Sequence, residues 1–387
     1  VLECFSAGLL RLISLLVQQS VFAMIQKKPG TLLIWSRPED DSEASDGGES
    51  GQMDHSHEET LVHEPEPLGQ DIFAMATVVA IRDYVWLKRG SKAYPLRLLR
   101  MIVSMMMVLA VMILQAFLLC AVHGLLCAGS VAHIRKDYSA YELHMYGSDH
   151  VHKTVNGFYR GSDHQFLDVP KFMEMDDDMK HSVCQIPLAH QTYLFAILLV
   201  WSLTCIAELR STVEQVDGLL IRTPTVNSVD EVLDNAEEGA VAVIGLTLPI
   251  KFMVATLCLI PRIVSVCVLC LLGCRWLVAT NSLSDVLLNA LALEFMLVLK
   301  DLLYTTLASK RNKFLTENTT FMIPPPGEFG IPGALGSLSW ALLGCLWVYL
   351  YIFKFQKVLP EYNWDVHEVC ATWEQAQHIS NILQVFS

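Results

Sequence analysis

Five stretches of mainly apolar residues alternate with polar segments along this chain. Each of them approaches or exceeds the roughly 20 residues that a helix needs to cross a hydrocarbon core about 30 Å thick. The predicted spans cover residues 101–132, 192–209, 260–279, 283–308 and 335–353. The pattern therefore predicts an all-α fold, a polytopic transmembrane helix bundle of five spans.

Residues 240–258 leave the number of spans open between five and six. They are apolar enough to cross a membrane, but Pro249 and Lys251 interrupt them. A lysine at the centre of an inserted helix costs about 2.5–3.5 kcal/mol. We therefore expect an amphipathic or re-entrant helix here, with a sixth span as the alternative.

The segments outside the spans differ sharply in character. A strongly basic stretch directly precedes residue 101. By the positive-inside rule, this stretch places the start of the first span in the cytosol. The remaining expectations are an interfacial amphipathic helix (1–36), a disordered acidic linker (37–70), an amphipathic basic pre-membrane segment (71–100), an extracytosolic polar segment (133–190), a cytosolic loop (210–239) and a soluble C-terminal tail (354–387).

Composition agrees with an integral membrane protein whose lipid bilayer is its first partner. Hydrophobic residues make up 53% of the 387 and charged residues 17%, whereas soluble domains carry about 25% charged residues. The formal net charge is −13, and residues 39–71 contain many acids and no base. Such a tract would repel phosphate, so nucleic acid is not an expected partner. The particular membrane cannot be read from the sequence.

The eleven cysteines do not form a disulfide framework. Most lie in or beside apolar runs, where a thiol behaves as a small hydrophobe. Cys184 and Cys370 fall outside these runs, and in a five-span topology both lie on the outer side of the membrane. They are expected to form a disulfide or to remain two free thiols. The spacing of Cys267, Cys270 and Cys274 favours close helix packing over a metal site, and no metal is expected.

The fourth predicted span is unusually polar. It carries Asp285, Asn289, Glu294, Lys300 and Asp301. Its large apolar side chains and these polar groups nearly cancel on the insertion scale, so the helix should not lie alone in lipid. At 100° per residue the polar groups form two opposite lines, which predicts a central helix with partners on both sides. Candidate partners on other segments are Arg262, Arg275, Lys251, Gln115, His123 and Glu208.

Two functions from different classes fit this polar helix. Intramembrane ionisable groups often mark ion or proton pathways, so Glu294, with Asn289 and Asp301, could line a path for an ion or small solute through a homo- or hetero-oligomer. Alternatively the same groups lock the bundle of a non-catalytic structural or assembly subunit. No P-loop, dinucleotide fingerprint, nucleophile elbow or zinc-protease motif is present in the sequence, so we expect neither an enzyme nor a cofactor.

The segment 258–307 resembles a recurrent segment of uncharacterised multi-pass membrane proteins of dinoflagellate-type protists. The resemblance is carried by Pro261-Arg262, Trp276-Leu277 and the run from Asp285 through Asn289 to Glu294-Phe295. It implies that the third and fourth spans form one unit, with Asn289 and Glu294 as fixed features. Lys300 departs from that pattern, in which an acidic or apolar residue is expected.

Overall fold

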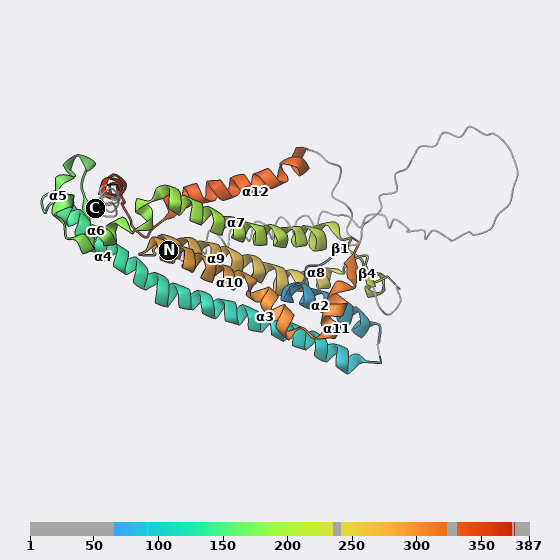
Figure 1. The fold of residues 1–387 in the computed structure, drawn as a ribbon. Coiled ribbons are helices and arrows are strands. Elements are labelled where there is room, and N and C mark those ends of the chain that lie inside the picture. Colours follow the sequence, from blue (N-terminus) through green and yellow to red (C-terminus); the bar gives the residue numbers. More distant parts are fainter. Residues whose placement is uncertain (1–65, 91, 235–240, 323–330, 374, 376–387) are drawn as a thin grey trace, which may run out of the picture.

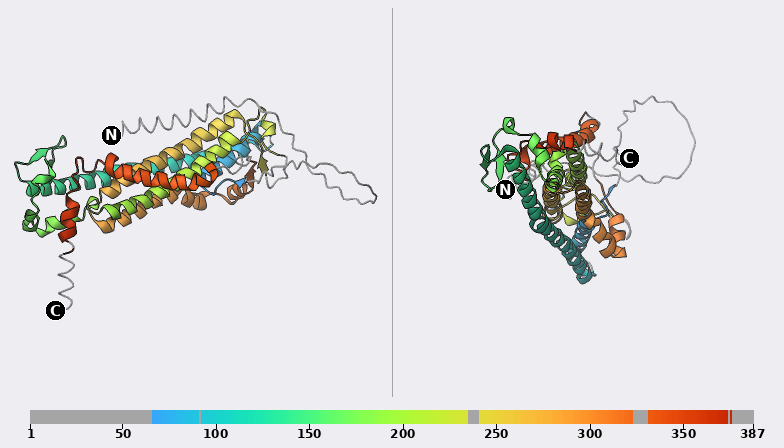
Figure 2. Two further views of the ribbon diagram at one scale, coloured as in Figure 1. Left: turned by 90° about the horizontal axis from the view of Figure 1, so that it is seen from above. Right: turned by 60° about the vertical axis from the view of Figure 1, so that its left-hand side comes forward.

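The chain folds into a long bundle whose helices run side by side along one axis (Figure 1). The computed structural model describes residues 66–90, 92–234, 241–322, 331–373 and 375. The interfacial helix predicted at 1–36 and nearly all of the linker predicted at 37–70 lie outside the described residues. In the view from above, the short helices and strands gather at the two ends of the bundle (Figure 2).

Four helices of the described part are long and apolar enough to cross a membrane. The first joins α3 (Tyr94–Ala121) and α4 (Ala128–Tyr146) through a π-helical turn. The second is α7 (Gln191–Val216), the third joins α8 (Leu248–Val254) to α9 (Ile260–Val278), and the last is α12 (Ile331–Leu350). π-Helical turns at Asp217–Arg222 and Tyr351–Phe355 extend the second and last helices. This is the character of a membrane-integral protein.

The fourth predicted span forms a helix that is not among those four. α10 (Leu283–Leu307) has 25 residues, so it is about 37 Å long and could cross a hydrocarbon core. Its charged residues, however, exclude it from the four helices that are apolar enough to be candidate membrane spans. The structure therefore shows four helices that are long and apolar enough to cross a membrane, and a fifth span remains a prediction.

The prediction of a separate helix at 240–258 is wrong. Residues 248–278 form one continuous helix, with a π-helical turn at Ala255–Leu259 in place of a break. Lys251 is buried, and its Nζ donates hydrogen bonds to the carbonyls of Leu220 and Thr223 at 3.0 and 2.6 Å. Because these carbonyls at the end of the α7 extension satisfy the ammonium group, the helix does not have to break at this lysine.

The pre-membrane segment is also unlike the amphipathic helix that was expected. α2 (Ile72–Lys88) is buried on nearly every side, including Arg82 and Asp83. It packs against α3 and α11 (Lys310–Glu317) at one end of the bundle. Its apolar residues therefore pack against other parts of the protein on nearly every side, and its two buried charged residues, Arg82 and Asp83, have partners inside the protein.

A small sheet closes the same end of the bundle, which we call the sheet end. Its strands are β1 (Glu66–Pro67), β5 (Thr319–Phe321) and β4 (Val241–Val243), in that order. β5 pairs antiparallel with β1 and parallel with β4. The expected cytosolic loop at 210–239 is partly helical, because the second helix continues to Arg222.

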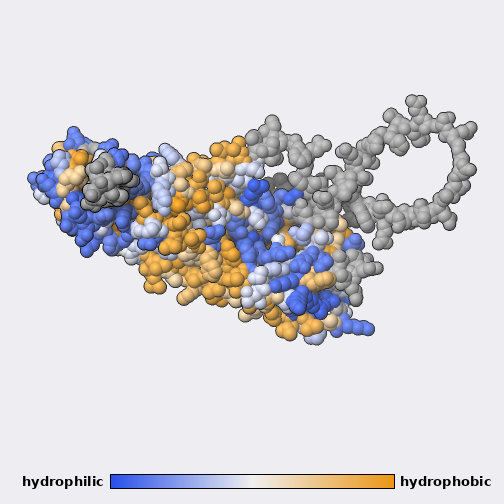
Figure 3. Space-filling view, in the orientation of Figure 1, coloured by the Kyte–Doolittle hydropathy of each residue, from blue (hydrophilic) through white to orange (hydrophobic). Residues whose placement is uncertain are grey.

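The opposite end, which we call the tail cap, is built from two segments far apart in sequence. The first contains the last turns of α4, the hairpin of β2 (Val151–Lys153) with β3 (Tyr159–Gly161), α5 (Pro170–Glu174) and α6 (Asp177–Cys184). Short 3-10 turns lie at His164–Phe166 and Pro187–Ala189 in this segment. A third 3-10 turn, at Val229–Glu231, comes before β4 in the chain. Hydrophilic residues cover the tail cap, beside an apolar band on the bundle (Figure 3).

The second segment of the tail cap is the C-terminal tail, which was expected to be a soluble segment. Its residues 366–373 are helical, and Cys370 is joined to Cys184 of α6 by a disulfide, with a Cα–Cα distance of 5.4 Å. This bond is one of the two alternatives that the sequence left open. It connects the tail directly to the polar segment between the first two long helices.

Two buried carboxyl groups also hold the tail cap together, one linking the tail to α4 and the other linking α4 to β3. The Asp365 carboxylate accepts hydrogen bonds from the hydroxyls of Tyr138 and Tyr146, at 3.0 and 3.3 Å. The Glu142 carboxylate accepts one from the backbone N–H of Gly161 in β3. Both carboxyl groups are fully buried, so the protonation of Glu142 affects how firmly the tail cap holds together.

The tail cap is expected to lose stability as pH rises toward neutrality. Burial, and then the negative charge of Asp365, raise the pKa of Glu142 from 4.5 to about 7. The folded protein therefore retains a proton that the unfolded chain has released, and the cost of ionising Glu142 is absent below about pH 4.5 and grows until about pH 7. Between about pH 4.5 and pH 7 the free energy of unfolding should fall by about 3 kcal/mol for this reason.

Thermal unfolding of the detergent-solubilised protein at pH 4.5 to 8 would measure this effect, with Glu142→Gln as the matched variant. The stability of wild type relative to the glutamine variant should fall across this range. A constant difference between the two proteins would show that Glu142 does not titrate there.

Candidate functional site

Two basic and two acidic side chains from four separate segments meet near the sheet end. Arg262 comes from the first turn of α9, Lys300 from α10, Glu208 from α7, and Asp71 from the residue that precedes α2. We call these four residues the ionic network. Lys300 lies 17 residues beyond the start of α10, or about 26 Å along the helix, so the network lies nearer the end of α10 than its start.

Arg262 is the centre of the network. Its guanidinium donates to Glu208 Oε1 at 2.7 and 2.9 Å and to Gln215 Oε1 at 3.0 Å, and it lies 3.0 Å from Asp71 Oδ2. The Arg262 side chain is only 4% exposed and the Asp71 side chain 6%. A planar guanidinium with five N–H donors can join several acceptors in this way, which a lysine could not do with the same geometry.

Lys300 adds the second positive charge. Its Nζ lies 3.4 Å from Glu208 Oε2, 3.0 Å from Asp301 Oδ1 and 3.9 Å from Asp71 Oδ2. Within the network the two cations balance Glu208 and Asp71, while Asp301 is more exposed and adds a further negative charge. Balanced charges with short contacts offset much of the cost of removing them from water.

Asp71 has a second role that explains its position. Its Oδ1 accepts a hydrogen bond from the backbone N–H of Ala74 at 2.7 Å, which caps the N-terminus of α2. A carboxylate at this position also interacts favourably with the helix dipole. The ionic network therefore ties the start of α2 to three long helices.

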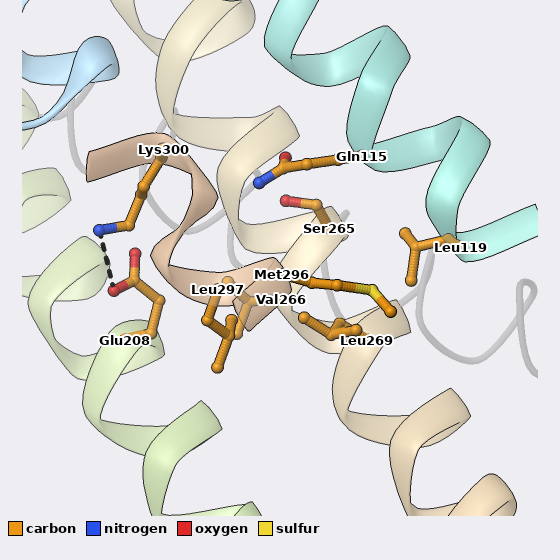
Figure 4. Close-up of a pocket in the computed structure, with 9 residues that line it drawn as sticks. All are labelled: Gln115, Leu119, Glu208, Ser265, Val266, Leu269, Met296, Leu297 and Lys300. Atoms are coloured by element: carbon orange, nitrogen blue, oxygen red, sulfur yellow. Dashed lines mark ion pairs between the residues drawn. The ribbon is translucent and has the colours of Figure 1, made fainter. Parts of the chain in front are cut away.

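A small cavity adjoins the network between α3, α7, α9 and α10. Its polar lining is Gln115, Glu208, Ser265 and Lys300, and the side chains of Gln115 and Ser265 approach each other across it (Figure 4). The space open to the centre of a water-sized sphere is about 20 Å³, which is room for one water molecule or little more. Gln115 Oε1 is buried and has no hydrogen-bond partner among the described residues.

The predicted site residues separate into two groups. Lys300 and Asp301 belong to the network or contact it, and Arg262 and Glu208 are two of the partners that the sequence suggested. Asn289 instead donates a local hydrogen bond to Thr280 Oγ1 at 2.9 Å. Asp285 and Glu294 are exposed on the outside of α10.

The expected position of Glu294 in the middle of the bundle is therefore wrong. α10 buries Val286, Leu293, Leu297 and Lys300 against its neighbours, and Glu294 lies just outside that face. No ion pair involving Glu294 is found in the described part of the chain. The sequence predicted two lines of polar residues on opposite sides of α10. Only the line that contains Lys300 contacts another long helix, because α10 lies at the surface of the bundle and the line that contains Glu294 faces outward.

Asp71 was the functional residue that sequence reasoning missed. It stands at the end of the acidic tract, so composition places it with the linker and not with the spans. The signal that could have revealed it is local: an aspartate directly before a long apolar helical run is a typical N-cap.

The cysteines of α9 act in packing. Gly273 lies against Trp201 of α7, so closely that a Cβ atom at this position would come within 2.5 Å of the indole nitrogen. The indole donates to the carbonyl of Cys270 at 3.3 Å, and Cys274 Sγ lies 4.0 Å from Ser202 Oγ. Among the described residues, no group of three or more His, Cys, Asp or Glu side chains could hold a metal ion.

Comparisons with known proteins add no family to this description. No protein-family model, no curated protein and no solved structure matches the chain. The resemblance to multi-pass proteins of dinoflagellate-type protists therefore stays a prediction, and the class of the protein rests on the membrane-integral helix bundle itself.

Proposed function

We propose that this protein is a non-catalytic assembly subunit of a membrane complex, and that the outer face of α10 binds a helix of a different protein. The observation that carries the proposal is Glu294, an exposed carboxylate on a mainly apolar helix face. If α10 crosses the membrane, Glu294 lies about 16 Å from the start of the helix, close to mid-depth.

The exposed face of α10 has the pattern of a helix–helix interface. Its exposed apolar residues recur at spacings of three and four, as in a coiled-coil seam. They are Leu288, Leu291, Phe295, Val298 and Leu302. Glu294 and Asp301 follow one edge of this seam, seven residues apart, and Asp285 lies at the other edge.

Charge decides which partner fits this face. A carboxylate near the centre of the membrane is costly unless it is neutralised or paired. A second copy of α10 packed on the same face would bring further acids to the edges of the seam. A helix that carries lysine or arginine beside its own apolar seam would pair with Glu294, so the partner is expected to be a different, basic transmembrane helix.

The ionic network supports this role by fixing α10 in place. Lys300 connects α10 to Glu208 and, through the network, to α2 and α9. A docking surface is more effective on a rigid element than on a mobile one. The network thus acts as an internal lock, which is the structural interpretation of the polar helix.

The outward position of Glu294 also gives a second candidate function. If several copies arranged α10 around a common axis, Glu294 would line a path for an ion or small solute between them. This function needs a homo-oligomer, whereas the assembly function needs a different partner, so one experiment can separate them.

Site-specific photo-crosslinking in native membranes tests both functions. A photoreactive residue at Phe295 should give one discrete adduct with a different protein, and Glu294→Lys should abolish that adduct by reversing the charge. The same photoreactive residue at Leu338, exposed on α12, serves as the control and should not give this adduct.

Liposome reconstitution completes the test. The proposal predicts that the purified protein alone carries no ion flux. An adduct between two copies of this chain, together with flux that Glu294→Gln reduces, would reject the assembly function in favour of the pathway.

A further inference from the structure

Four arginines gather at the sheet end of the bundle, and two of them contact the carboxylate of Asp83. Arg82 comes from α2, Arg97 and Arg100 from α3, and Arg311 from α11. Arg100 Nε lies 2.6 Å from Asp83 Oδ2, and Arg97 lies 3.6 Å from Asp83 Oδ1. We call these four arginines the basic corner.

Positive charge exceeds negative charge in the basic corner. Burial and the charges of Arg100, Arg97 and Arg311 lower the pKa of Arg82 to about 10, while Asp83 acts in the opposite direction. Arg82 itself donates to a neutral acceptor, Thr319 Oγ1, at 2.8 Å. The four arginines are thus close enough to repel one another, and among the described residues Asp83 is the carboxylate that pairs with Arg97 and Arg100.

Two helices begin at this corner with basic residues and without an acid. Neither α3 nor α11 has an acidic residue in its first turn. The N-terminal end of a helix is positive, so basic residues there are unfavourable and a bound anion is favourable. Arg311 and its neighbour Lys310 are exposed in the first turn of α11, so an anion can reach them from outside.

An apolar surface continues from the corner along α3. Leu96, Leu99, Ile102, Val103 and Met106 are all exposed on this helix. Hydrophilic and apolar residues adjoin each other at this end of the molecule (Figure 3). A ligand that joins a negative headgroup to long apolar chains would match both the basic corner and the apolar face of α3. A soluble phosphate compound would contact only the basic corner.

We propose that the basic corner binds the phosphate headgroup of an anionic phospholipid, whose acyl chains lie along the exposed apolar face of α3. Clusters of basic residues beside a transmembrane helix attract anionic lipid headgroups, at about 1 kcal/mol for each base near the surface. This is about a fivefold change in affinity for each arginine removed. The proposal does not depend on the docking of a partner to α10.

Native mass spectrometry of the full-length protein in neutral detergent tests the proposal, with dioleoylphosphatidylglycerol as the anionic lipid and dioleoylphosphatidylcholine as the neutral one. The wild type should bind phosphatidylglycerol more tightly, and added salt should weaken this binding. Arg311→Ala should lower the affinity for phosphatidylglycerol about fivefold, and Arg97→Ala with Arg311→Ala roughly 25-fold.

Lys153→Ala provides the control, because Lys153 is an exposed base on the tail cap and its removal should leave lipid binding unchanged. Arg311 is exposed, so its replacement preserves the fold even if the double variant does not fold. Equal binding of the two lipids, or an unchanged affinity in Arg311→Ala, would overturn the proposal. Full displacement of the lipid by millimolar inorganic phosphate would also overturn it, by showing a phosphate site without a requirement for lipid.

Discussion

Replacing Arg262 with glutamine is expected to lower the free energy of unfolding by about 3–5 kcal/mol. The guanidinium contacts Glu208, Asp71 and Gln215, and the substitution would leave Lys300 as the only cation of the ionic network, beside the buried Asp71 and the half-buried Glu208. Buried charges that lose their partner cost far more than the original ion pair contributed. The loss should appear as a lower midpoint when the protein is unfolded by denaturant in detergent micelles.

Arg210→Gln is the matched control for this experiment. Arg210 also pairs with a glutamate, Glu214 at 2.8 Å, but its side chain is 42% exposed. Exposed pairs of this kind contribute about 0–1 kcal/mol. If the two glutamine variants were equally stable, the ionic network would not hold the bundle together.

A double variant separates lost pairing from lost packing. Glu208→Gln combined with Arg262→Gln removes one charge of each sign and leaves Lys300 beside Asp71. If unpaired charge is the main cost, this double variant should be more stable than the sum of the two single losses predicts. Simple additivity would instead indicate that each side chain acts through its packing.

Replacing Cys184 with serine is expected to release the C-terminal tail from the tail cap and to cost about 2–5 kcal/mol. The disulfide joins residues separated by 186 positions, so it removes much of the freedom of the unfolded chain. The effect should be local at first, because the disulfide joins two segments that both lie in the tail cap. Limited proteolysis should cut the variant near residues 356–373 at protease levels that leave wild type intact.

Cys345→Ser is the control for the disulfide, since Cys345 is a free, exposed thiol. Its replacement should change neither proteolysis nor stability. Alkylation of the wild type without reductant should leave Cys184 and Cys370 unlabelled. Labelling of both cysteines would show that the tail cap lies in a reducing compartment and that the bond is not formed there.

The helices themselves could largely be predicted from the sequence. A run of apolar residues such as 101–132 needs a low-dielectric environment and satisfied backbone groups, and a helix supplies the latter from within the same segment. The ends of the helices were less predictable. Residues 133–146 extend the first helix well beyond the apolar run, because tertiary contacts in the tail cap stabilise turns whose own composition is polar.

The candidate site could be predicted only in part. The sequence indicated that the polar groups of α10 need partners inside the protein, and Glu208 and Arg262 were among the candidates that it suggested. It also predicted partners inside the protein for Glu294, although this residue is exposed on the outer face of α10. An angular position on a helix says which residues share a face, but not which face the neighbouring helices cover.

The sequence by itself determined that this chain is helical and membrane-integral, because hydrophobic run length is a local property of the residues. Only the tertiary structure decided that Asp71 meets Arg262 from nearly 200 residues away, that Lys251 binds the carbonyls at the end of α7, and that α2 is buried on all sides. The physical reason is that a charge can be satisfied by any partner within about 4 Å, and which residues come that close depends on the packing of the whole bundle.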